Sequence, residues 1–171
     1  MNHSLAQLAK FIGNGTVHDH VVNWLQTVPG LPPIVQTVHI VCIACIMGSI
    51  VMIDLRVLGV AVRSQSPQEM LRRLMPWMWW SLALLLASGA MFVIARPRRY
   101  FANPIFGYKM SLLALALFFS VALRWSLGRQ ANSNANVIGA KLCATASLLS
   151  WLGVILAGRW IAYVDYIFPQ E

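Results

Sequence analysis

Four long apolar stretches, separated by shorter polar ones, dominate the hydrophobic pattern of the chain. Each contains the roughly 20 apolar residues that a helix needs to cross a bilayer. The stretches cover about residues 34–57, 75–95, 105–124 and 142–164. They lack the alternation of apolar and polar positions that is typical of membrane β-strands. Because sequential helices joined by short connections run antiparallel, the pattern predicts an all-α, up-down bundle of four transmembrane helices.

The N-terminal segment has a different pattern. Two short amphipathic helices are predicted there, over about 5–12 and 17–27, because a capping-box-like pair precedes the apolar face of each. These pairs are Ser4 with Gln7 and Thr16 with Asp19. Neither helix is long enough to span, so both are expected to lie on the membrane surface. The predicted segments are therefore interfacial helices over 1–32, the bundle over 33–165 and a tail over 166–171.

Two signals locate the starts of later helices. Ser66 before Pro67 supplies an N-cap and a proline at the first helical position, and Asn103 before Pro104 does the same for the third span. The first long helix is expected to continue to about Arg63, which leaves a tight connection to the second.

Composition supports the membrane assignment. The chain is 58% hydrophobic and 11% charged, with a mean hydropathy of +0.66, which is more apolar than a soluble domain of 171 residues can bury in one core. A net charge of +8 would suggest nucleic acid in a soluble protein. Here it is better explained by arginines in loops that face anionic lipid, so the lipid bilayer is the expected partner and nucleic acid is not.

The distribution of basic residues predicts the orientation. One side of the membrane receives six of them: Arg63, Arg72, Arg73, Arg124, Arg129 and Lys141. The other side receives four: Lys10, Arg96, Arg98 and Arg99. The positive-inside rule favours the first set being cytoplasmic. We therefore expect a multi-pass protein of the bacterial inner membrane with both termini in the periplasm.

Three spans carry a basic or imidazole group at a similar depth. His39 lies about six residues into the first span, Lys109 about five into the third and Arg159 about six from the end of the fourth. At 1.5 Å per residue, each lies roughly 7–9 Å below the same boundary. Arg96 lies at that boundary. Basic groups at one depth could bind an anionic partner, such as a carboxylate, a phosphate headgroup or haem propionates. His39 would then be available to ligate iron or accept a proton.

Structural explanations stand beside this one. Lys109 and Arg159 would also be accommodated if each extended its charged end to the interface. His39 would equally suit a hydrogen-bonded structural histidine. Asp54 is expected to form a structural ion pair with Arg124 or Arg56 near the opposite boundary.

No sequence motif indicates soluble-type catalysis. The chain contains no P-loop, nucleophile elbow, HExxH or dinucleotide fingerprint, and we expect a protein without enzyme activity. Cys42 and Cys45 have CxxC spacing, yet a reactive thiolate needs a wet, electropositive setting that the middle of a span lacks. Cys143 also lies in a span, and a disulfide framework is not indicated by these three thiols.

Several short motifs resemble those of a known group of proteins. They are His39-x8-Gly48, the Asp-Leu-Arg-Val-Leu-Gly run over 54–59, Arg-Arg-Leu-x-Pro over 72–76, Ser88-Gly89, Asn-Pro-x-Phe-x-x-Lys over 103–109 and Ala-Gly-Arg-Trp-Ile-Ala-Tyr over 157–163. With these motifs the chain resembles a family of small bacterial membrane proteins of unknown function. It is more distantly similar to CopD-type copper-resistance and HemJ-type haem-biosynthesis membrane proteins.

The resemblance implies a helical bundle in which His39 and Lys109 match functional positions of HemJ-type proteins, with haem b as the cofactor. The chain departs from that pattern because no second histidine lies in any span. A second axial ligand would have to be His18 or His20 of the interfacial segment, a methionine or Lys109. Copper handling is not favoured, since clusters of Met and His are missing.

Three hypotheses follow. The protein is a haem-b-binding redox or electron-transfer protein, an accessory or scaffold subunit of a membrane complex, or a small transporter or anion-binding protein. A homo-oligomer or a partner within a membrane complex is compatible with each of them.

Overall fold

The computed structural model describes residues 3–61, 64–128 and 134–167 as an all-helical chain. The helices are α1 (His3–Gly13), α2 (Thr16–Thr27), α3 (Leu31–Leu58), α4 (Pro67–Ala95), α5 (Pro97–Phe101), α6 (Pro104–Gly128) and α7 (Asn134–Ile167). No strand occurs in these ranges. The predicted fold class, an all-α polytopic bundle with short N-terminal helices, is confirmed.

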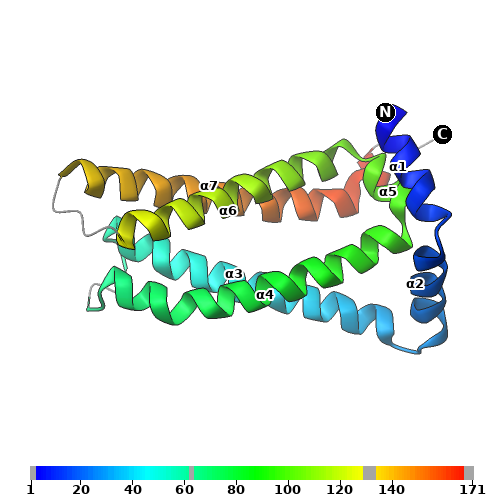
Figure 1. Cartoon of the computed structure of the whole chain (residues 1–171), viewed down its shortest axis with the longest axis horizontal. Coiled ribbons are helices and arrows are strands. Elements are labelled where there is room, and N and C mark those ends of the chain that lie inside the picture. The colour runs from blue at the N-terminus through cyan, green and yellow to red at the C-terminus, as the bar shows by residue number, and fades with distance from the viewer. Residues whose placement is uncertain (1–2, 62–63, 129–133, 168–171) are drawn as a thin grey trace.

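Four of the helices are long and apolar enough to cross a membrane. The spans are Leu31–Leu58, Pro67–Ala95, Pro104–Leu127 and Val137–Ile161. They form two antiparallel pairs, α3 with α4 and α6 with α7, and α3 also packs against α7 to join the pairs (Figure 1). The order along the chain is therefore the predicted up-down one.

The two ends of the bundle differ (Figure 1). One end, the N-terminal end, carries α1, α2 and α5, and both chain ends lie there. At this end α2 runs across the ends of the long helices. The opposite end, called the loop end, holds the α3–α4 and α6–α7 connections. The predicted location of both termini on one side of the bundle agrees with this arrangement. Arg63 and Arg129, two of the basic residues counted for the orientation, lie outside the described ranges.

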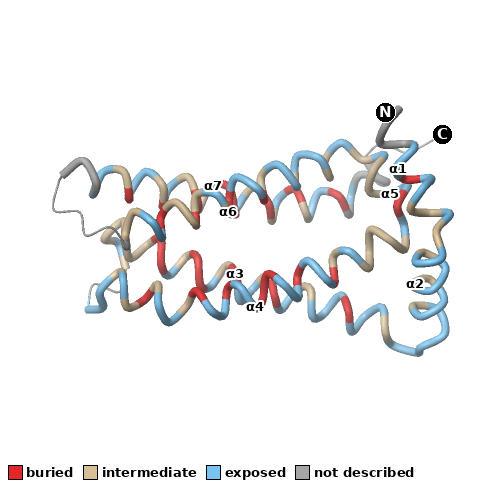
Figure 2. The backbone as a smooth tube through the Cα atoms, in the orientation of Figure 1, coloured by how far each residue is buried: buried red, intermediate tan, exposed pale blue. Residues whose placement is uncertain are grey.

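Buried residues line the inside of the four long helices (Figure 2). The main cluster lies in the middle of the bundle and includes Ile46, Ile50, Met78, Ala116 and Trp151. A second cluster near the loop end contains Ile53, Met70, Leu123, Ala140 and Ala144. Large apolar side chains on the opposite faces are exposed, as expected for helices that face lipid.

Two of the predicted helix starts agree with the structure, at Ser66 and Asn103. Ser66 Oγ accepts a hydrogen bond from the Glu69 backbone N–H at 3.1 Å, and Asn103 Oδ1 accepts one from Ile105 at 2.9 Å. The predicted cap at Thr16 is wrong, because Gly15 is the N-cap residue of α2 and no side chain caps that end. Ser4 lies inside α1, which begins at His3. The prediction that the first long helix continues to Arg63 is wrong, because α3 ends at Leu58. Gly59 follows with a φ of 80°, and the next N–H, that of Val60, bonds to the Leu55 carbonyl at 3.0 Å. Glycine adopts this left-handed conformation at little cost, so it stops the helix.

Candidate functional site

His39 lies on the face of α3 that packs against α4. Its Nδ1 is 2.8 Å from Ser88 Oγ, and its ring meets the edge of Phe92 with centroids 5.9 Å apart. Gly89 makes room for the ring, since a Cβ at that position would lie 3.4 Å from His39 Cε1. The Ser88-Gly89 pair noted in the sequence therefore forms the surface on which the imidazole rests.

The hydrogen bonds of Ser88 favour one tautomer of His39. Ser88 Oγ–H points to the carbonyls of Leu84 and Leu85, at 2.8 and 3.1 Å. A hydroxyl has one proton, so with that proton directed to the helix carbonyls its oxygen can only accept from His39. In this arrangement His39 donates from Nδ1, and in the neutral ring of that tautomer the lone pair is on Nε2.

Lys109 reaches the same level from the other helix pair. Its side chain lies over Gly158 of α7, where a Cβ would be 3.5 Å from Lys109 Nζ and 3.6 Å from Cε. Its charge acts electrostatically on His39. Two of the predicted residues, one from each pair of helices, thus lie at a similar level near the N-terminal end.

Arg159 is not brought to that pair. It follows Gly158 by one residue, about 100° around α7, and it is exposed. Its Nη2 donates to the Tyr163 hydroxyl at 2.8 Å, and its guanidinium lies 5.0 Å from the centre of that ring. Leu156 and Trp160 are its neighbours on this outward face. This position favours the alternative in which Arg159 extends along the lipid-facing surface to the interface.

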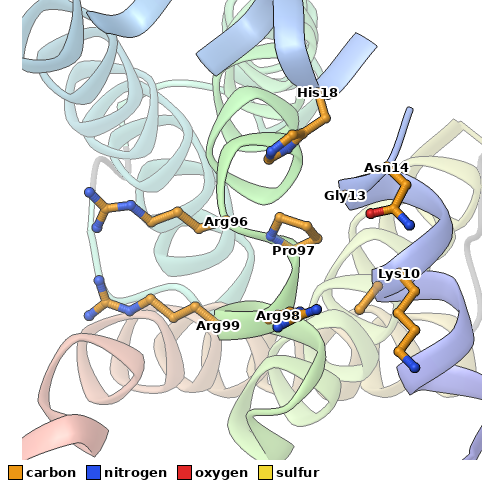
Figure 3. A pocket seen from close by; sticks show the side chains of 9 residues that line it. Lys10, Gly13, Asn14, His18, Arg96, Pro97, Arg98 and Arg99 are labelled. Carbon is orange, nitrogen blue, oxygen red and sulfur yellow. The ribbon is translucent and has the colours of Figure 1, made fainter. Parts of the chain in front are cut away.

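A basic cavity of about 410 Å³ lies at the N-terminal end, between α1, the start of α2 and α5 (Figure 3). Its lining residues include Lys10, His18, Arg96, Arg98 and Arg99. In Figure 3 the guanidinium groups of Arg96 and Arg99 extend side by side in the same direction. Of these five residues, only Arg96 and His18 were predicted from the sequence to belong to a site. The Arg-Pro-Arg-Arg run over 96–99 was the available signal, but only the folded chain places Lys10 opposite it.

His18 connects α2 to the end of α4. Its Nδ1–H donates to the Ile94 carbonyl at 2.7 Å, near the last turn of α4. Ile94 lies six residues beyond Ser88, about 9 Å along the helix axis. The structure therefore places His18 at the basic cavity and not beside His39. His20 is exposed on α2.

The predicted ion pair of Asp54 with Arg56 or Arg124 does not form. Within the described part of the chain, Glu69 makes the two ion pairs, with Arg72 and Arg73. Asp54 is 1% exposed and faces Ser147 of α7. Arg56 is two residues further, about 200° around α3, and its Nε donates to the Gln65 carbonyl. Arg124 is exposed beside the buried Leu123, so neither guanidinium shares the face of Asp54.

The donor set at His39 has one strong metal ligand. Among the described residues, no group of three or more His, Cys, Asp or Glu side chains could hold a metal ion. Cys42 is buried and Cys45 exposed, both as free thiols. A metal bound here would therefore have to bring most of its own ligands.

A comparison with family models matches residues 26–164, which include all four spans. No curated protein and no solved structure matches the chain. The distant resemblance to CopD-type and HemJ-type proteins therefore stays a prediction. The chain belongs to a family of unknown function, DUF6644.

Proposed function

We propose that the protein binds haem b through Nε2 of His39 and acts as a redox or electron-transfer protein of the membrane. The observation that carries this proposal is the hydrogen bond between His39 Nδ1 and Ser88 Oγ, because it leaves the lone pair on Nε2. Metal-ligating histidines commonly donate their other N–H in this manner, which fixes the tautomer and orients the ring.

The surrounding residues fit haem better than a bare ion. A porphyrin supplies four nitrogens, so one histidine is a sufficient protein ligand. The Lys109 ammonium, which already acts on His39, would pair with a propionate. Bound haem supplies a one-electron couple, and the residues of the chain orient the ring and hold the charge near it.

The absorption spectrum of the purified protein tests the proposal. The protein, expressed with a haem precursor and extracted in mild detergent, is expected to show a Soret band that shifts on reduction with dithionite. Apoprotein titrated with haemin should take up one equivalent. A colourless protein that also fails to take up haemin would contradict the proposal and favour the scaffold hypothesis.

A second candidate function, binding of an anionic phospholipid headgroup, is favoured by the basic cavity. Lys10, Arg96 and Arg98 line this cavity, beside two short helices whose Phe11 and Trp24 are 83% and 64% exposed. Exposed aromatic residues on interfacial helices insert among headgroups, and each nearby cation contributes about 1 kcal/mol with anionic lipid.

Arg98→Gln is therefore expected to weaken retention of phosphatidylglycerol about fivefold, measured by native mass spectrometry of protein released from mixed micelles. Arg124→Gln, an exposed arginine at the loop end, is the matched control and should retain the lipid. Equal losses in both variants would show that the cavity adds nothing to general surface charge. Competition by inorganic phosphate would distinguish a free anion site from a lipid site.

A further inference from the structure

Asp54 is an acidic residue whose side chain is buried inside the bundle. It lies on α3, four residues before the helix ends, and is 1% exposed. One of its oxygens, Oδ2, has no hydrogen-bond partner, and its carboxyl group faces Ser147 of α7. A carboxylate with an unpartnered oxygen is very costly at such a depth, whereas a neutral acid costs far less.

Ser147 begins a chain of hydrogen bonds between helices. Ser147 Oγ, which is fully buried, lies 3.4 Å from Ser120 Oγ of α6. Ser120 Oγ–H donates to the Ala116 carbonyl at 2.8 Å. Ser120 Oγ also accepts the indole N–H of Trp151 at 3.2 Å. Asp54 on α3 is thereby connected to α7 and α6 through two hydroxyls.

The number of hydroxyl protons in this series of hydrogen bonds distinguishes the protonated state of Asp54 from the ionised state. Ser120 gives its proton to Ala116, so it can only accept from Ser147. Ser147 has one proton. If that proton goes to Ser120, Ser147 must accept from Asp54, and only the neutral acid can donate. If Asp54 were a carboxylate, Ser147 would have to donate to it, and its contact with Ser120 would contain no proton.

Charged neighbours do not stabilise the ionised form. On the four packed helices near this level the charged residues are Arg56, Glu69, Arg72, Arg73, Arg124 and Lys141. Arg56 bonds to the Gln65 carbonyl, and Arg72 and Arg73 pair with Glu69. Arg124 and Lys141 are exposed, and the ion pairs among the described residues do not include Asp54.

From this geometry we propose that Asp54 is a proton-binding site, in which the neutral carboxylic acid donates to Ser147 and completes the chain Asp54–Ser147–Ser120–Ala116. Release of the proton to water leaves a carboxylate and reverses the Ser147 hydroxyl. The reversal breaks the bond between Ser147 and Ser120. The ligand of this site is one proton, and its occupancy sets whether α7 is bonded to α6 or to the Asp54 carboxylate of α3.

Infrared difference spectroscopy tests the site directly, because the chain contains only five carboxyl side chains. At neutral pH the wild-type protein in lipid is expected to show the C=O stretching band of a protonated acid, which Asp54→Asn removes. Glu69→Gln is the matched control, since Glu69 is ion-paired and ionised, and should leave the band intact. Ser147→Ala should shift the band without removing it.

A second measurement does not depend on how well the Asn variant folds. A group that is protonated when folded and ionised when unfolded makes the folded state bind more protons, so stability falls as pH rises. Wild-type protein should therefore unfold at lower denaturant concentration as pH is raised from about 5 to about 8. An ordinary aspartate side chain is already ionised throughout this pH range. A wild-type spectrum with no protonated-acid band at neutral pH would overturn the proposal, as would a band that survives in Asp54→Asn.

Discussion

His39→Ala is expected to abolish the Soret band of the purified protein and its uptake of haemin. Alanine removes the Nε2 lone pair that the Ser88 hydrogen bond leaves available. No other histidine lies in a span, and His18 is bonded to the Ile94 carbonyl at the end of α4. Loss of the one protein nitrogen that would ligate the iron should therefore lower haem occupancy by about an order of magnitude or more.

Two further variants distinguish loss of the iron ligand from disruption of the fold. His20→Ala, an exposed histidine of α2, is the matched control and should leave the spectrum unchanged. Ser88→Ala removes the partner of Nδ1 and should keep haem while shifting its reduction potential, because Ser88 positions the ring and does not touch iron. An unchanged Soret band in His39→Ala would refute the assignment of His39 as ligand.

Trp151→Ala is expected to have the largest effect on stability, with a loss of about 3–5 kcal/mol in the free energy of unfolding in detergent. Trp151 is 2% exposed in the middle of the main cluster, and its indole N–H donates to Ser120 Oγ. In a bilayer, helices associate largely through van der Waals packing, so a cavity of this size removes contacts that lipid cannot replace. The variant also deletes a donor to the Asp54 chain.

Trp160→Ala provides the control on the same helix. Trp160 is 57% exposed and faces outward beside Arg159, so its removal should change the free energy of unfolding by no more than about 0.5 kcal/mol. Ser120→Ala combined with Trp151→Ala should cost less than the sum of the two single changes, because both remove the same hydrogen bond. Similar losses for the two tryptophans would show that α7 does not pack as described.

The pattern of apolar residues was sufficient to predict the helices. A stretch of about 20 apolar residues has few alternatives to a spanning helix, since lipid offers no partner for free backbone groups. The starts at Pro67 and Pro104 were also predictable, because the caps Ser66 and Asn103 act through residues two or three positions away. The end of α3 was missed because Gly59 was interpreted as part of a continuous helix.

The site could be predicted only in part. The equal depth of His39 and Lys109 follows from counting residues along a helix axis, since each residue adds a fixed rise. Whether two such residues face each other depends on the rotation of each helix about its axis. A sequence with apolar residues around most of each span specifies that rotation weakly, because lipid and core are both apolar.

That rotation decided the partners of the polar residues. It turned Asp54 toward Ser147 and away from both arginines, and it turned Arg159 outward while Gly158 received the Lys109 side chain. Packing of α1 against α5 likewise brought Lys10 to the arginines of 96–99. The sequence by itself therefore determined the helices, their order and the depth of each polar group. Only the tertiary structure decided which groups meet, because contacts between helices depend on side-chain packing over segments far apart in the chain.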